Sequence, residues 1–266
     1  MLSVDRLLNS SSILLPASLL YQNGALFTRA FPRVCHSSSI FFIMVAMNRV
    51  ALIFDLDGTL WDAALPVSEI WTEEGKKRFG PDYFLSEADV RAEMGKTMDQ
   101  IVSEVAPKLK TKEERDAFAQ LFLDSETVYL KDHPGRLFPK EIETLQLLRE
   151  WGYPLYIVSN CQKGYIENFI PLLPEGTISD FLCWGDTHGK KHETILALMK
   201  KNQVEKAIYI GDTRGDEIET HEANLPFIHA DYGYGVCLRP EGRITSFEEL
   251  PQIVKQLEAE YDNRSY

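Results

Sequence analysis

The sequence has few cysteines, and they lie far apart in the chain. Its 266 residues contain four, Cys35, Cys161, Cys183 and Cys237, with no CxxC or Cys/His finger spacing among them. Disulfide frameworks and structural zinc sites require such clustered ligands. We therefore expect reduced thiols, and the disulfide-stapled and zinc-finger classes are excluded.

An excess of basic charge is also missing. The chain has 28 Lys and Arg against 40 Asp and Glu, a formal net charge of −12, and its basic residues do not cluster into a stripe, apart from short pairs such as Lys200-Lys201. Binding to a phosphate backbone needs a basic surface. Nucleic acid is thus excluded as a partner, whereas a small anionic substrate is still allowed if a local divalent cation offsets the overall field.

Long hydrophobic runs are absent as well. No stretch reaches the roughly 20 apolar residues of a membrane-spanning helix, so we expect no membrane partner. The hydrophobic fraction of 44% is ordinary for a globular protein that buries a sizeable core. The length fits one domain that carries an insertion.

The first 46 residues differ in composition from the rest. They are rich in Ser and Leu and carry three arginines against one acid, Asp5, which is typical of an organellar transit peptide. The alternative is that translation begins at Met44 or Met47. We favour this alternative, and expect residues 1–46 to be disordered and the protein to be cytoplasmic. A real transit peptide would make the protein organellar.

The most informative stretch is an apolar run that ends in two carboxylates. Residues 50–54 are typical of a strand buried on both faces. Asp55 and Asp57 follow at once, and then comes a Gly58-Thr59 turn. Open α/β sheets build their active sites at the carboxyl ends of such strands. We hypothesise that Asp55 is a nucleophile and Asp57 its acid/base partner.

The order of elements predicts the fold class. Four helical stretches follow one another without a strand between residues 66 and 131, and strands and helices then alternate to the C-terminus. Such alternation predicts an α/β fold, a doubly wound parallel sheet of Rossmann-like type, with an inserted all-helical unit. We expect the α/β core to span residues 47–64 and 135–266, and the helical unit to span residues 65–134.

Two further strands also end in polar residues. Ser159-Asn160 follows the predicted strand 154–158, and Asp212, Thr213 and Asp216 follow the strand 207–210. Each group alone could be a helix cap or a turn. Together, at one edge of a sheet, their carboxylates would repel one another without a cation. Oxygen ligands select a hard ion, so Mg²⁺ is the expected cofactor.

These residues resemble the four motifs of haloacid dehalogenase-superfamily phosphatases. The resemblance lies in Asp-Leu-Asp-Gly-Thr at 55–59, in the strand end at Ser159, in a following lysine, and in Gly-Asp-Thr with Asp216. It covers roughly residues 48 to 240. The helical insertion is similar to the cap of the phosphoglycolate phosphatase and β-phosphoglucomutase branch.

The resemblance implies a role for each residue. Asp55 attacks phosphorus to give an aspartyl-phosphate, and Asp57 protonates the leaving oxygen and then activates water. Asp55, the backbone carbonyl of Asp57 and Asp212 hold Mg²⁺, with Asp216 in reach or acting through water. Ser159 and a lysine clamp the phosphate. Such a nucleophile divides hydrolysis into two easier displacements, and the pKa of Asp57 must be raised toward neutrality.

The lysine motif departs from the family pattern, because no proline follows the lysine. Lys191, nearest the start of the helix, is our choice for the clamp, and Lys190 is the alternative. Thr59 and Asn160 are further candidates for contact with phosphate. Lys96, in a loop of the insertion, is either a substrate reader or an exposed lysine.

We therefore expect a Mg²⁺-dependent phosphatase, similar to phosphoglycolate phosphatase, acting on a small phosphorylated metabolite as a monomer or homodimer. One alternative is a phosphomutase of the β-phosphoglucomutase type, which shares all four motifs. Another is a non-catalytic phosphate-binding regulator, which would have degenerate motifs. A dehalogenase is disfavoured because that branch lacks the second aspartate, and Asp57 is present.

Overall fold

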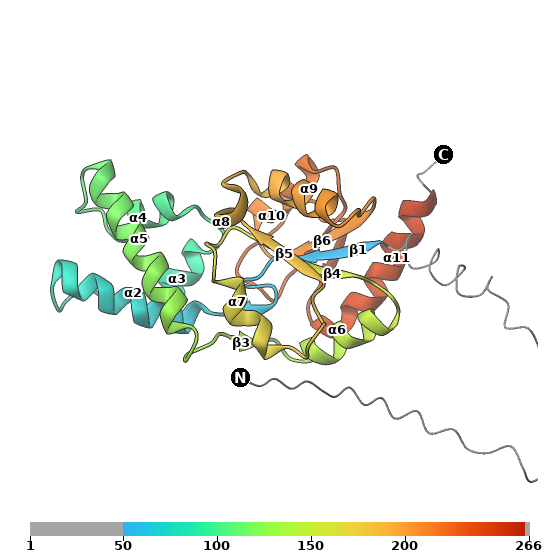
Figure 1. The fold of residues 1–266 in the computed structure, drawn as a ribbon, viewed down its shortest axis with the longest axis horizontal. Coiled ribbons are helices and arrows are strands. Elements are labelled where there is room, and N and C mark those ends of the chain that lie inside the picture. Colours follow the sequence, from blue (N-terminus) through green and yellow to red (C-terminus); the bar gives the residue numbers. More distant parts are fainter. Residues whose placement is uncertain (1–49, 264–266) are drawn as a thin grey trace, which may run out of the picture.

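The computed structural model describes residues 50–263, so our expectations for residues 1–46 lie outside the described residues. A six-stranded sheet with helices on both faces forms one part of the molecule, and four helices lie together to one side of it (Figure 1).

All neighbouring strands of the six-stranded sheet are parallel, and their order is β5-β4-β1-β6-β7-β8. The predicted doubly wound parallel sheet is thereby confirmed. The sequence did not predict its short edge strand β8, which has no apolar run. The strands are β1 (Ala51–Phe54), β4 (Leu155–Ser159), β5 (Asp180–Cys183), β6 (Ala207–Gly211), β7 (Phe227–Ala230) and β8 (Gly242–Ile244).

Strand β1 lies between β4 and β6 and is buried on both faces. Leu52 and Phe54 belong to the apolar layer that contains residues of α6 (Glu141–Glu150) and α11 (Leu250–Asn263). Ile53 belongs to the opposite layer, which contains residues of α9 (Lys191–Lys201). Figure 1 shows α9 and α10 (Arg214–Glu222) above the sheet and α6 below it. This two-sided burial removes water from β1 and fixes the position of the residues that follow it.

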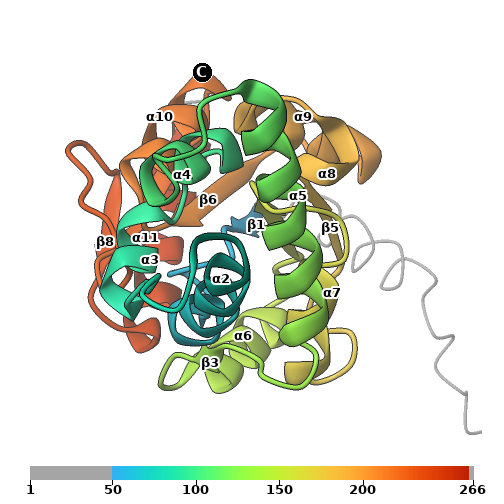
Figure 2. The same cartoon turned by 90° about the vertical axis from the view of Figure 1, so that its left-hand side faces the viewer.

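The inserted helices are held by their own aromatic core and by side-chain caps. Trp71 stacks on Phe122 with ring centroids 4.8 Å apart. The side chain of Ser86 accepts a hydrogen bond from the backbone N–H of Asp89 and so caps the helix that starts at Glu87. In Figure 2 these helices lie toward the viewer, in front of the end of β1. They are α2 (Ala64–Phe79), α3 (Glu87–Glu93), α4 (Met98–Val105) and α5 (Lys112–Tyr129).

The two chain segments that join the inserted helices to the sheet pair with each other. Strand β2 (Trp61–Asp62) is antiparallel to β3 (Arg136–Leu137), with Trp61 opposite Leu137. We call this pair the connecting ribbon. Its strands are two residues long and have no periodicity, which is why the sequence did not reveal them.

The segments on either side of β5 differ from simple alternation. Directly after β5, Trp184 begins the short helix α8 (Trp184–Thr187), because the carboxylate of Asp186 accepts a hydrogen bond from the backbone N–H of Cys183. The segment before β5 contains α7 (Ile166–Phe169) and a 3₁₀ turn (Ile170–Leu172), and a second 3₁₀ turn (Phe247–Glu249) precedes α11.

The cysteines and the hydropathy of the helices agree with the sequence where the structure describes them. Cys161, Cys183 and Cys237 are free thiols. Among residues 50–263, no helix combines the length and the apolar character needed to cross a membrane.

Candidate active site

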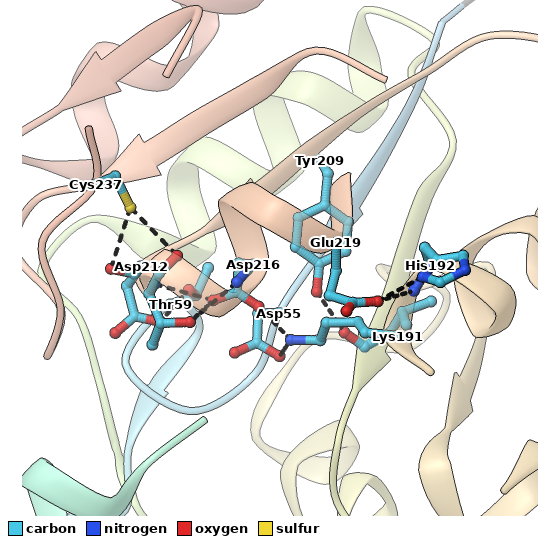
Figure 3. Close-up of polar contacts among 11 residues, drawn as sticks. Asp55, Thr59, Lys191, His192, Tyr209, Asp212, Asp216, Glu219 and Cys237 are labelled. Atoms are coloured by element: carbon cyan, nitrogen blue, oxygen red, sulfur yellow. Dashed lines mark hydrogen bonds and ion pairs between the residues drawn. The ribbon is translucent and has the colours of Figure 1, made fainter. Parts of the chain in front are cut away.

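Three aspartates meet at the carboxyl ends of the neighbouring strands β1 and β6. Asp55 follows β1, Asp212 follows β6, and Asp216 lies in the first turn of α10. Each offers a carboxylate oxygen within 4.8 Å of the others, and all three are buried (Figure 3). The structure thus brings together three of the predicted metal ligands.

Local hydrogen bonds fix the orientation of two of these carboxylates. Oδ2 of Asp216 accepts from the backbone N–H of Thr213 at 2.9 Å, in the capping box that starts α10. Oδ1 of Asp212 accepts from the hydroxyl of Thr59 at 3.2 Å, and its Oδ2 accepts from the backbone N–H of Tyr234 at 2.7 Å. Gly58 has φ +78°, and a Cβ there would lie 2.3 Å from Asp212 Oδ2. Only glycine leaves room for this approach.

Lys191 is the cation of the cluster. Its Nζ lies 2.8 Å from Asp55 Oδ1 and also bonds to Asp216 Oδ1, and the residue is only 4% exposed. The position follows from α9, whose first residue is Lys191. Its neighbour Lys190 is exposed, so the structure places Lys191 rather than Lys190 against the aspartates.

One ammonium does not balance three buried carboxylates. Burial, together with the charges of Asp216 and Asp55, raises the pKa of Asp212 well above its usual range. Burial also raises the pKa of Asp55 to about 6, although Lys191 opposes this. A buried, all-oxygen donor set with an excess of negative charge fits a hard divalent cation such as Mg²⁺. Asp55, Asp212 and Asp216 would hold it. The side chain of Asp57 is not in this group, and the predicted contribution of Asp57 is its backbone carbonyl.

The side chain of Asp57 has its own set of donors. Its Oδ1 accepts hydrogen bonds from Trp61 Nε1 at 2.9 Å and from the hydroxyl of Tyr165 at 2.8 Å. Burial and the charge of Asp55 raise the pKa of Asp57 to about 7. A carboxyl of this kind can give and take a proton near neutral pH. The sequence offered no signal for Tyr165, which is 108 residues from Asp57 in the chain.

A cavity of about 860 Å³ opens in front of these side chains and extends to the inserted helices. Ser159 and Asn160 line it at the end of β4, as do both Lys190 and Lys191. Thr59 does not line it, because its side chain is fully buried behind the aspartates and bonds to Asp212. The α/β core contributes the following polar residues to the cavity lining, among others: Asp55, Asp57, Ser159, Asn160, Lys190, Lys191 and Asp216.

Lys96 lines the cavity from the side of the inserted helices. Its Nζ lies 3.0 Å from Glu93 Oε2 and 2.8 Å from Glu104 Oε2. The charge of Lys96 is therefore already matched by two carboxylates, a relationship that sequence spacing alone did not reveal.

The chain belongs to the haloacid dehalogenase-like hydrolase family, whose model matches residues 52–230. It is accordingly an enzyme of this superfamily, and the curated relatives that it matches are phosphoric monoester hydrolases by name. The chain is 29% identical over 216 residues to a phosphoglycolate phosphatase of Rhodobacter capsulatus, covering 77% of this chain and 96% of that protein. It is 27% identical over 192 residues to a phosphoglycolate phosphatase of Aquifex aeolicus, covering 69% and 85%.

Solved structures share the fold. A predicted phosphoglycolate phosphatase from Haemophilus somnus superposes with a TM-score of 0.65 at 22% identity, covering 76% of this chain and 96% of that one. CbbY from Rhodobacter sphaeroides, solved with phosphate, gives 0.62 at 16% identity, covering 75% and 95%. At these identities the similarity concerns the arrangement of the sheet and helices.

Proposed function

We propose that the chain is a Mg²⁺-dependent phosphatase that hydrolyses a small phosphorylated metabolite through an aspartyl-phosphate on Asp55. One observation carries this proposal. Buried Asp55 forms an ion pair with Lys191, and its charge, together with burial, raises the pKa of Asp57 to about 7. The names of the relatives make phosphoglycolate the first substrate to test.

In the first step a carboxylate oxygen of Asp55 attacks phosphorus and the bond to the leaving oxygen breaks. Asp57 gives its proton to that oxygen, so the product leaves as an alcohol. In the second step water attacks the phosphorus of the aspartyl-phosphate, and the Asp57 carboxylate takes the proton of the water. Free phosphate leaves and Asp55 is restored. Bound Mg²⁺ would supply positive charge that offsets the repulsion between phosphate and carboxylate.

Lys191 and Ser159 hold the substrate phosphate in this scheme. The ammonium of Lys191 already lies against Asp55, so it offsets charge where the phosphate must approach the nucleophile. Ser159 lies at the end of β4, next to β1, and lines the same cavity. Asn160 and Lys190 contact the phosphate only from the exposed side of the cavity.

We further propose that residues 65–134 act as a cap that closes over the α/β core. The support is the cavity, whose lining comes both from the ends of β1 and β4 and from α4 and α5. The connecting ribbon is where the two parts meet in the chain, so it is the natural hinge.

The test is the substitution Asp55→Asn, assayed by release of inorganic phosphate over a panel that includes phosphoglycolate, with Mg²⁺ present. Turnover should be abolished while the fold and most of the Mg²⁺-dependent thermal shift remain, because the amide still offers an oxygen ligand. Asp82→Asn, at an exposed turn, is the matched control and should keep full activity. Full activity in Asp55→Asn would end the nucleophile assignment. Isomerisation of a sugar phosphate with a bisphosphate primer, without net phosphate release, would instead establish the phosphomutase alternative.

A further inference from the structure

The wall of the cavity that faces the catalytic aspartates has an unusual charge distribution. The inserted helices contribute only two basic residues to the described lining, Lys96 and Lys112. Lys96 is held between Glu93 and Glu104 at 3.0 and 2.8 Å. Lys112 bonds to both oxygens of Asp116, at 2.9 and 2.7 Å. Both basic residues on this wall are thus already paired with carboxylates.

The same wall carries a buried acid, Glu126 of α5. The residue is 4% exposed, and its carboxyl oxygens accept hydrogen bonds from Gln162 Nε2 at 2.7 Å and from Trp71 Nε1 at 2.8 Å. Both partners are neutral, so no cation balances a charge on Glu126. Burial raises the pKa of Glu126 to about 8, and the nearby charge of Asp57 adds to this. The group is therefore largely a neutral carboxyl at pH 7, which can both donate and accept a hydrogen bond.

These features disfavour a second anion on the substrate. A carboxylate in the leaving group would enter a wall with no unpaired ammonium and would lie near the charge of Asp57, so no cation would compensate its desolvation. Lys190, on the opposite side of the cavity, is exposed, and a pair formed there would be weak in water. Hydroxyl groups carry no charge that needs compensation, and the wall also includes the neutral amides of Gln100 and Gln120. Gln100 Oε1 accepts from the backbone N–H of Thr97, and Gln120 Nε2 donates to Asp124.

We propose that the inserted helices select phosphate monoesters of neutral, hydroxyl-bearing alcohols over substrates with a second anionic group, and that Glu126 is the residue that binds the leaving-group hydroxyl. This inference depends on the proposed phosphatase function and specifies its substrate class. The cavity volume of about 860 Å³ lies in the range of sites for ligands well above the size of a two-carbon acid.

The decisive comparison uses two substrates that differ in one group. Phosphoglycolate carries a carboxylate where 2-hydroxyethyl phosphate carries a hydroxymethyl group, and glycerol 2-phosphate extends the neutral series. We expect kcat/KM to be at least about tenfold higher for the neutral esters. A preference for phosphoglycolate overturns the inference and leaves the phosphatase function intact. Failure to hydrolyse any monoester, p-nitrophenyl phosphate included, contradicts the phosphatase function and this inference with it.

Two variants separate the roles of the wall residues. Glu126→Gln keeps the shape but changes the donor and acceptor pattern, and should lower the ratio of kcat/KM between 2-hydroxyethyl phosphate and phosphoglycolate by about tenfold. Glu104, whose side chain is 52% exposed, is one of the two carboxylates paired with Lys96. Glu104→Ala removes this partner, so Lys96 can pair with the substrate carboxylate, and kcat/KM for phosphoglycolate should rise several-fold. Glu113→Ala makes the same charge change at an exposed position outside the cavity and is the matched control.

The same measurements can overturn the inference. A substrate ratio that is unchanged in Glu126→Gln, with an unaltered melting temperature, removes Glu126 from substrate binding. An equal gain for phosphoglycolate in Glu113→Ala would show that overall charge, rather than the pairing of Lys96, controls the discrimination.

Discussion

The hydroxyl of Tyr165 donates a 2.8 Å hydrogen bond to Oδ1 of Asp57, although 108 residues separate the two in the chain. Trp61 Nε1 donates to the same oxygen at 2.9 Å, and the two rings pack edge to face with centroids 5.5 Å apart. Because both donors meet Oδ1, the proton of a neutral Asp57 must be on Oδ2. Tyr165 and Trp61 thus determine which oxygen of Asp57 gives the proton.

Replacing Tyr165 with Phe should therefore affect reactions that need a proton donor more than those that do not. We expect kcat/KM for an alkyl phosphate to fall by about tenfold, a small part of the 10²–10⁴ that general acid catalysis contributes. For p-nitrophenyl phosphate, whose leaving group departs as an anion, the fall should be under about threefold. Steady-state kinetics on both substrates make the measurement. Equal losses on both would contradict the positioning role. Tyr129→Phe, which removes an exposed hydrogen bond to Glu69, is the control.

The two adjacent lysines should differ greatly in effect. Lys191→Ala leaves the buried Asp55 and Asp216 without their ammonium, and activity should fall at least about a hundredfold. Breaking a buried pair also costs about 3–5 kcal/mol of stability, which should appear as a lower melting temperature, above all in EDTA. Lys190→Ala changes an exposed side chain and should cost no more than a few-fold. If the larger loss came with Lys190→Ala, the phosphate clamp would be reassigned to that residue.

Removing divalent cations should destabilise the protein as well as inactivate it. Bound Mg²⁺ would relieve the repulsion among Asp55, Asp212 and Asp216 in the folded state. At a hundred times its Kd, binding to the folded state alone would add about 2.7 kcal/mol to the free energy of unfolding. Thermal melts with EDTA and with added Mg²⁺, at matched ionic strength, measure this shift. Asp212→Ala, which removes the ligand oxygens, should reduce the shift strongly, whereas Asp82→Ala should not. A full Mg²⁺ shift in Asp212→Ala would place the cation elsewhere.

The free energy of unfolding should also fall as pH rises, because of a buried carboxyl that is not part of the aspartate cluster. Glu141 is buried, its Oε1 has no hydrogen-bond partner, and burial raises its pKa to about 9 from 4.5. Between those values the folded state holds a proton that the unfolded state has released. The free energy of unfolding therefore falls as pH rises through this window, by up to about 1.4 kcal/mol per unit.

The isosteric substitution Glu141→Gln should remove this contribution. Chemical unfolding at pH 5, 7 and 8.5 should give a flatter profile for the variant and a higher stability at pH 8.5. A variant profile parallel to that of the parent chain would refute this assignment. Glu143→Gln, on the exposed face of the same helix, is the control.

The sequence was informative wherever short-range chemistry decides the structure. The apolar run before Asp55 predicted β1, and the start of α9 at Lys191 was predicted at the right residue, because apolar periodicity and the helix start are local signals. The convergence of Asp55 with Asp212 followed from the rule that parallel strands share one carboxyl edge.

What the sequence could not supply were pairings made by tertiary packing. Nothing near Lys96 indicated that Glu104, eight residues away, would share its charge with Glu93. Gln162 was not singled out, yet it reaches Glu126 across 36 residues because α5 packs beside the turn after β4. Thr59 lay in the right motif but points behind the aspartates, a direction set by the turn at Gly58.

Trp61 links the connecting ribbon to the side chain of Asp57. Trp61 is part of β2, which pairs with β3, and the same indole donates to Asp57. A rotation of the inserted helices about this ribbon would carry the indole with it and alter its hydrogen bond to the acid. If the proposed cap moves in this way, opening of the cavity and loss of one of the two donors to Oδ1 of Asp57 would occur together.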